Sequence, residues 1–272
     1  MTTTMAPLTG AQPGRVTQAR VVASEWIKLR TLRSTLLTLA GGVVCVVGLG
    51  LLISALRAND FKQNGIRVGP GFDPTLVTLR GVYLAQLPIG VLGVLLVTGE
   101  YSTGMIRATL AAVPKRLPVV WAKVAVFATV VFVISFIAAM VAFTGGRSFL
   151  TGAGIHLSLS THGSARAVLG AALYLTTVGL LGVGLGFIIR NTAGAIATLF
   201  GMILVLPALA AALPQNLYND IYRYLPLPAG TQVMTTVTDH SLLRPWDGML
   251  VFALYAVAAI AVGAVVLLRR DA

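Results

Sequence analysis

One stretch of this sequence, residues 98–123, gathers side chains that could do chemistry in a chain otherwise rich in apolar residues. Glu100 stands near its start, the segment YSTGMIRATLAAV follows, and Lys115 and Arg116 stand between two prolines. A carboxylate near the start of a helix and cations near its end complement the helix dipole. The pattern therefore predicts a short helix over 102–113, about 18 Å long at 1.5 Å per residue.

The predicted helix also has a cap and an apolar face. Ser102 or Thr103 is the expected cap, because a hydroxyl can accept from free backbone amides at a helix start. One face of this helix carries Met105, Ile106, Thr109, Leu110 and Val113. Arg107 lies to the side of that face. A simple connector could be shorter, so we interpret the segment as a docking element that a soluble motor can push; the alternative is a helix that only stabilises its loop.

Enzyme chemistry is not indicated elsewhere. His156 and His162 are six residues apart, which does not match the spacing of a helical metal pair, and His240 is distant in sequence. Ser164 is close to His162, but no orienting carboxylate lies nearby in sequence. We therefore expect no catalytic residue and no metal site in this chain.

A phosphate-binding loop of the Walker type needs a lysine directly after a glycine. The four lysines of this sequence follow Ile27, Phe61, Pro114 and Ala122. We expect no cofactor in this chain. If ATP drives the protein, Mg-ATP must be bound by a separate partner chain.

The composition defines the elements that must position these residues. Hydrophobic residues make up 57% of the 272 residues and charged residues 10%, far below the roughly 25% of a soluble domain. Long charge-free windows of about 20 residues can each cross the roughly 30 Å hydrocarbon core as a helix. The predicted spans are about 34–56, 79–99, 119–145, 166–189, 192–213 and 248–268.

These windows predict an all-α membrane protein with six transmembrane helices. The charge-free windows themselves, 34–56, 81–99, 124–146, 167–189, 191–219 and 248–268, contain no Asp, Glu, Lys, Arg or His. This argues against a carrier that couples to protons or sodium through intramembrane carboxylates. The single cysteine, Cys45, allows no intrachain disulfide. From the six windows we expect residues 34–272 to form one six-span domain.

Residues 1–33 precede the first span and lack the apolar core of a cleaved signal peptide. A stripe at helical spacing comprises Val22, Trp26, Leu29 and Arg33. The basic side chains of Arg20, Lys28 and Arg30 point away from it. The pattern favours an amphipathic elbow helix in the membrane interface with Trp26 at headgroup depth; the alternative is a basic flank that only orients the first span.

The charge bias of the loops predicts the orientation. With the N-terminus inside, twelve lysines and arginines are cytoplasmic and eight are external. Both termini are then cytoplasmic in a multi-pass protein. Basic flanks facing anionic membrane lipid account for the net charge of +12, so no nucleic-acid partner is expected.

Polar side chains within the spans are candidates for a substrate cavity. They are Ser54, Gln86, Thr176 and Thr177. Each can instead act as polar glue between helices, which is the more common role. Gly182 and Gly186 form a G-x-x-x-G pattern, and we expect them to pack on a neighbouring helix of the same subunit.

A further amphipathic segment, residues 219–225, precedes the last span. Ile221, Tyr224 and Leu225 fall on one face of a helix in this segment. We interpret it as a helix on the outer surface, with an external gate as its functional form.

Three stretches resemble actinobacterial permeases of the ABC type-2 exporter family. They are SEWIKLRTLRSTLLTL before the first span, GEYSTGMIRATLAAVPKR after the second, and YLPLPAG between the fifth and sixth. The second is the most specific, and the resemblance covers essentially the whole chain. It implies a type V exporter-like fold in which two permeases, as a homodimer or a heterodimer, bind two copies of a separately encoded ABC ATPase.

The resemblance also implies roles for individual residues. The segment from Glu100 to Val113 would be a coupling helix in contact with the ATPase, and Arg190 would face it from the second cytoplasmic loop. The implied coupling residues are Glu100, Ser102, Thr103, Met105, Arg107, Leu110 and Arg190. The expected function is ATP-driven export of a hydrophobic or amphipathic compound, such as a drug, antibiotic, peptide or lipid, across the plasma membrane. The alternative is a motor-independent scaffold or channel.

Overall fold

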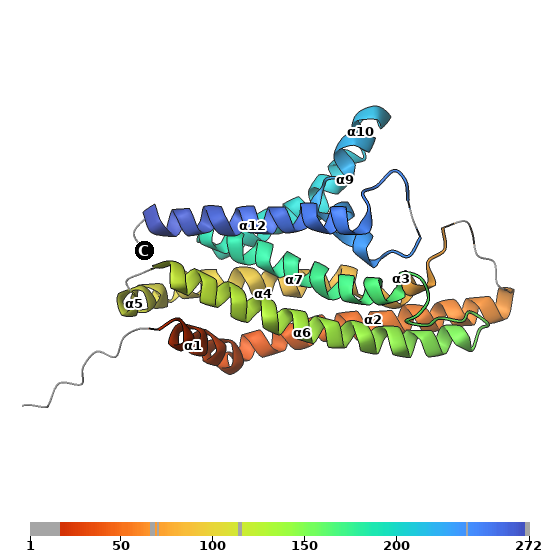
Figure 1. Cartoon of the computed structure of the whole chain (residues 1–272), viewed down its shortest axis with the longest axis horizontal. Helices are drawn as coiled ribbons and strands as arrows, with labels where there is room; N and C mark the ends of the chain where they lie inside the picture. Colours follow the sequence, from red (N-terminus) through yellow and green to blue (C-terminus); the bar gives the residue numbers. More distant parts are fainter. Residues whose placement is uncertain (1–16, 66–68, 70, 114–115, 238, 270–272) are drawn as a thin grey trace, which may run out of the picture.

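The computed structural model describes residues 17–65, 69, 71–113, 116–237 and 239–269, and within these ranges all regular secondary structure is helical. The helices form an elongated bundle (Figure 1). Six are long and apolar enough to cross a membrane: α2 (Arg33–Asn64), α4 (Val82–Ser102), α6 (Arg116–Thr151), α7 (Ser164–Ile189), the run of α8, η1 and α9 (Thr192–Ala210), and α12 (Pro245–Arg269). The predicted all-α fold with six spans is confirmed, and it indicates a multi-pass membrane protein.

Shorter helices connect or extend the spans. They are α1 (Gln18–Thr31), α3 (Pro74–Leu79), α5 (Met105–Ala112), α10 (Gln215–Tyr222), α11 (Pro226–Thr231) and the 3₁₀ turn η2 (Gln232–Met234). Figure 1 places α1, α5 and the last turn of α12 together at one end of the bundle, which we call the α1/α5 end. The opposite end, which holds α3, we call the α3 end.

The closest helix packing in the core joins α4 to α7 through glycines. A Cβ added at Gly93 would lie 2.0 Å from the carbonyl oxygen of Gly179, and one added at Gly182 would lie 2.6 Å from that of Gly90. The backbones can approach this closely only because these side chains are absent. The predicted packing of the G-x-x-x-G pattern within the subunit is confirmed, since Gly186 also faces α4.

The second span begins later than predicted because the chain bends before it. Helix α3 ends at Leu79, and α4 begins at Val82 rather than at residue 79. A Cβ added at Gly81, between the two helices, would lie 2.3 Å from the carbonyl oxygen of Cys45 in α2. This close approach holds the bend against the first span and leaves no room for a side chain.

The fifth span contains a change of helix type. Helix α8 (Thr192–Phe200) passes into the π-helical turn η1 (Gly201–Val205), and α9 (Leu206–Ala210) follows with Pro207 in its first turn. Proline lacks the amide that an α-helix interior needs, and a π turn is one local adjustment around it. Beyond α9 the chain leads into α10, which projects from the bundle (Figure 1).

Candidate functional site

Helices α1, α4, α5 and α6 pack together at the α1/α5 end. The backbone leaves the helical conformation at Leu32, which separates α1 from α2, and Gly104 adopts the left-handed conformation (φ 71°) between α4 and α5. Glycine occupies this region without steric cost, so the chain can turn sharply there. These two breaks allow α1 and α5 to pack beside the start of α6 rather than continue their spans.

A small apolar layer holds these helices together. Val21 of α1 packs with Val119 and Ala122 of α6, and all three are buried. Leu110 of α5 and Val113, directly after it, pack against the same layer. Helix α5 is therefore attached to α1 and α6 as well as to α4, the helix that precedes it.

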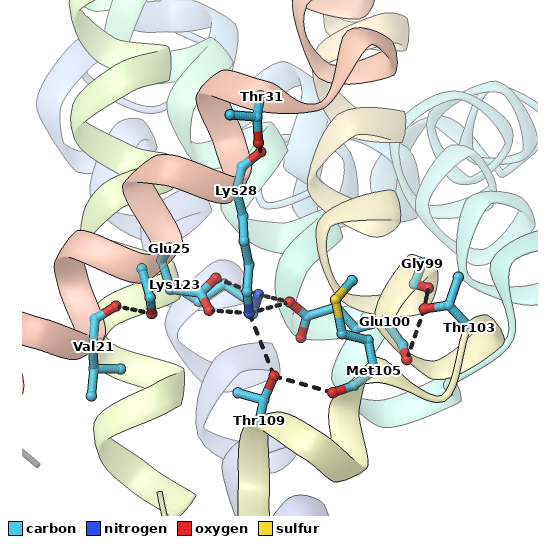
Figure 2. Close-up of polar contacts among 11 residues, drawn as sticks. Val21, Glu25, Lys28, Thr31, Gly99, Glu100, Thr103, Met105, Thr109 and Lys123 are labelled. Carbon is cyan, nitrogen blue, oxygen red and sulfur yellow. Dashed lines mark hydrogen bonds and ion pairs between the residues drawn. The ribbon is translucent and has the colours of Figure 1, made fainter. Parts of the chain in front are cut away.

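Beside this layer lies a buried charge network of two carboxylates and two amines (Figure 2). We define it as Glu25 and Lys28 of α1, Glu100 of α4 and Lys123 of α6. The Lys123 Nζ lies 2.6 Å from Glu25 Oε2 and 3.0 Å from Glu100 Oε1. The Lys28 Nζ lies 2.7 Å from Glu25 Oε1 and 2.9 Å from Glu100 Oε1. The network joins three helices and has no net charge.

Burial makes each of these charges depend on the others. Lys123 is 1% exposed, Glu25 2% and Glu100 6%. Burial alone would raise the pKa of Glu25, but the charges and hydrogen bonds of Lys123 and Lys28 outweigh it and lower that pKa. Burial alone would lower the pKa of Lys28, yet hydrogen bonds from it to Glu25 and Glu100 raise it. Both groups of α1 are thus held in their charged forms.

The network also contacts α5. The hydroxyl oxygen of Thr109 lies 3.5 Å from Lys28 Nζ, and the same hydroxyl donates to the Met105 carbonyl oxygen at 3.2 Å (Figure 2). Ile106 is buried, whereas Met105 and Arg107 are exposed. Of the predicted apolar face, Ile106 is thus buried and Thr109, Leu110 and Val113 are half-buried, whereas Met105 is exposed. Met105 and Arg107 lie on the exposed face of α5.

The predicted roles of Glu100, Ser102 and Thr103 as the start of this helix are wrong. Glu100 and Ser102 lie in the last turn of α4 and Thr103 is its C-cap; the Ser102 and Thr103 hydroxyls both donate to the Gly99 carbonyl oxygen. The cap position of α5 belongs to Gly104 instead, without a side-chain cap. The lysines offer Glu100 stronger partners than a helix dipole can. Consequently α5 is shorter than predicted, spanning eight residues.

The structure adds detail for two charged residues. Lys28 was expected to point away from the stripe of its helix, and its amine lies in the network. Lys123, which falls within the predicted third span, lies seven residues into α6, about 10 Å from the helix start. Trp26 is exposed; its position at headgroup depth stays a prediction.

Arg190 lies at the same end and contacts α12 and the end of α4. It ends α7 in the left-handed conformation (φ 58°) and donates from Nη2 to the Val266 carbonyl oxygen at 3.2 Å. Its guanidinium also stacks over the ring of Tyr101, 5.1 Å from the centroid. Arg116 donates to the Leu267 carbonyl oxygen at 2.7 Å. Together the two arginines satisfy carbonyls at the C-terminal end of α12.

The predicted substrate-cavity residues are spread over three helices and have local partners. The hydroxyls of Ser54, Thr176 and Thr177 each donate to the carbonyl oxygen four residues earlier in their own helix. Gln86 donates to the Tyr83 carbonyl oxygen and accepts from the Tyr174 hydroxyl. Gln86 therefore joins α4 to α7, in the manner of polar glue between helices.

The predicted gate residues lie where α10 turns into α11. Ile221 is in α10, whereas Tyr224 and Leu225 follow it. Ile221 is 40% and Tyr224 44% exposed. Helix α10 is amphipathic, as predicted, but it stands away from the bundle (Figure 1).

The sequence pattern pointed to Glu100 but not to the other three members of the network, Glu25, Lys28 and Lys123. Glu25 and Lys28 are three residues apart on one helix, a pair that is usually on the solvent-exposed surface.

Among the described residues, no group of three or more His, Cys, Asp or Glu side chains could hold a metal ion. Neither protein-family models nor curated protein sequences match this chain.

Proposed function

We propose that the chain is the membrane subunit of an ATP-driven exporter, with α5 as the helix that receives the motion of a separate ATPase. One observation supports this most. Helix α5 presents an exposed face with Met105 and Arg107, while its inner side is attached to α1, α4 and α6 through the charge network and the apolar layer. A force applied to such a helix is passed to three other helices together.

The charge network suits this role because separating its ion pairs costs free energy. Removing one partner from a buried ion pair leaves an uncompensated charge and costs about 3–5 kcal/mol. The pairs Lys28–Glu100 and Lys123–Glu25 join α1 to α4 and to α6. We therefore expect α1, the end of α4 and the start of α6 to move as one body when α5 is pushed.

The proposed assembly contains two permease chains and two ATPase chains that carry Mg-ATP, in the plasma membrane with both termini of the permease cytoplasmic. The compound moved is hydrophobic or amphipathic, and its path lies between the two permeases. Support comes from the charge-free windows of the spans, from the missing phosphate-binding loop and from the resemblance of residues 99–116 to exporter permeases. Arg190 would fix α12 to the moving end rather than contact the ATPase directly.

The test compares two charge reversals in proteoliposomes that contain the permease and an ATPase encoded beside it. Arg107→Glu changes an exposed residue of α5, and Arg147→Glu changes an exposed residue at the other end of α6. We expect Arg107→Glu to reduce the permease-dependent stimulation of ATP hydrolysis about tenfold, which corresponds to ~1.4 kcal/mol of contact energy. Arg147→Glu should leave it unchanged.

Thermal unfolding of both variants in detergent is the control for folding. Equal stimulation by the two variants would show that α5 does not contact the motor. Failure of any ATPase to associate with the permease would favour the motor-independent scaffold or channel.

A further inference from the structure

A pocket of about 230 Å³ lies beside the charge network, between α1, α2 and α4. Its walls are apolar and include Leu29, Leu92 and Leu96, and the charge network forms part of its lining. Leu32 and Leu95, which also line it, are 46% and 36% exposed, so the pocket opens at the surface of the bundle. It thus combines a charged inner part with an apolar mouth.

One carboxylate oxygen in this lining has no hydrogen-bond partner among the described residues. Both Lys28 and Lys123 bind Oε1 of Glu100, and Oε2 of the same carboxylate is buried without a donor. A buried acceptor left unsatisfied costs about 1–3 kcal/mol, and more when it is charged. A ligand that donates a hydrogen bond to Glu100 Oε2 would remove this cost.

The charge of the network selects the kind of donor. Two glutamates and two lysines balance, so the network gives an ammonium, carboxylate or phosphate group no net attraction to offset the cost of burying its charge. An uncharged hydroxyl does not carry that cost. The hydroxyls that line the same pocket can accept further hydrogen bonds; they belong to Ser34, Thr35, Thr38, Ser102 and Thr103.

The size of the pocket limits how much of a ligand it can hold. Pockets for drug-sized molecules are roughly 300–1,000 Å³, so this one takes only a headgroup and the first part of a chain. The rest of the chain would leave past Leu32 and Leu95. We propose that the pocket binds a single-chain amphiphile with an uncharged headgroup that bears hydroxyls, and that Glu100 Oε2 accepts from one of them. This inference goes beyond the transport proposal and requires no ATPase.

The experiment uses the purified permease alone, in lipid nanodiscs, with a monoacylglycerol that carries a photoreactive diazirine in its acyl chain. We expect cross-links to concentrate in residues 29–38 and 92–96. Leu95→Trp, which fills the mouth, should reduce this labelling about tenfold, equivalent to ~1.4 kcal/mol of binding. Leu84→Trp is the matched control, since Leu84 is 44% exposed on the same helix outside this pocket.

Competition with unlabelled compounds of equal chain length tests the headgroup. Glycerol monolaurate should displace the probe at least about tenfold better than its di-O-methyl ether, which lacks donors. Laurate and dodecylamine should compete as poorly as the ether. Equal competition by all four, or labelling spread over all lipid-facing helices and insensitive to Leu95→Trp, would overturn the proposal and leave only bulk lipid contact.

Discussion

The two ends of the bundle use buried charge in different ways. At the α1/α5 end, Lys123 binds carboxylates from two other helices through side chains alone. At the α3 end, the buried carboxylate of Asp73 instead accepts from backbone amides of Leu76, Thr236 and Val237. Nearby, Arg166 donates to the Thr235 carbonyl oxygen at 2.7 Å.

The two ends also differ in what their buried charges hold together. Backbone hydrogen bonds at Asp73 cap α3 and fasten the segment between η2 and α12, so they fix a loop in place. Ion pairs at Lys123 and Lys28 join three helices, α1, α4 and α6. Under the proposed function, such a connection would pass a displacement from one helix to the others, whereas a fastened loop would resist it.

The largest effect expected on stability comes from Lys123→Met. This change leaves Glu25 and Glu100 buried with only Lys28 as a partner, so we expect a loss of about 3–5 kcal/mol in the free energy of unfolding. Denaturant unfolding in detergent measures it. Lys62→Met is the control, because Lys62 is exposed at the other end of α2, and it should stay within about 0.5 kcal/mol. Equal losses for the two variants would mean that the network contributes nothing specific.

A smaller and more local effect is expected from Asp73→Asn. The amide keeps the shape of the side chain but removes the charge from its hydrogen bonds, which are worth about 1.5–3 kcal/mol when charged. Hydrogen exchange should therefore accelerate at the Thr236 and Val237 amides. Stimulation of an ATPase should not change. A loss of stimulation as large as that expected for Arg107→Glu would contradict the separation of the two ends.

The smallest expected effect on stability is that of changing the pH near neutrality. The pKa of Glu25 is lowered from its ordinary value of 4.5, so its contribution is complete above pH 4.5 and is lost as the pH falls through the lowered value. The pKa of Lys28 is raised from 10.5, so its contribution is complete below pH 10.5 and is lost as the pH rises through the raised value.

Unfolding measured against pH for Glu25→Gln and for Lys28→Met tests both directions. The difference between Glu25→Gln and the native chain should be constant at neutral pH and shrink only below pH 4.5. For Lys28→Met it should shrink only above pH 10.5. A difference that changes between these two values would show that another group controls the α1/α5 end.

The sequence by itself determined the six spans, because an apolar window long enough to cross a membrane is a local property. It also determined that a short helix with Ile106 and Leu110 on its inner side follows the second span, since this depends on neighbouring residues alone. The boundaries were less certain because the bend at Gly81 depends on α2, which approaches from elsewhere in the chain.

Only the tertiary structure decided what Glu100 does. Its partners, Lys28 and Lys123, are 72 and 23 residues away in sequence, and Glu25 is 98 residues from Lys123. Local periodicity gives the face of a helix on which a charge lies but not which distant helix packs against that face. A charge near a helix end can complement the helix dipole or pair with another helix. The second is stronger once burial removes water, and burial is a property of the folded bundle.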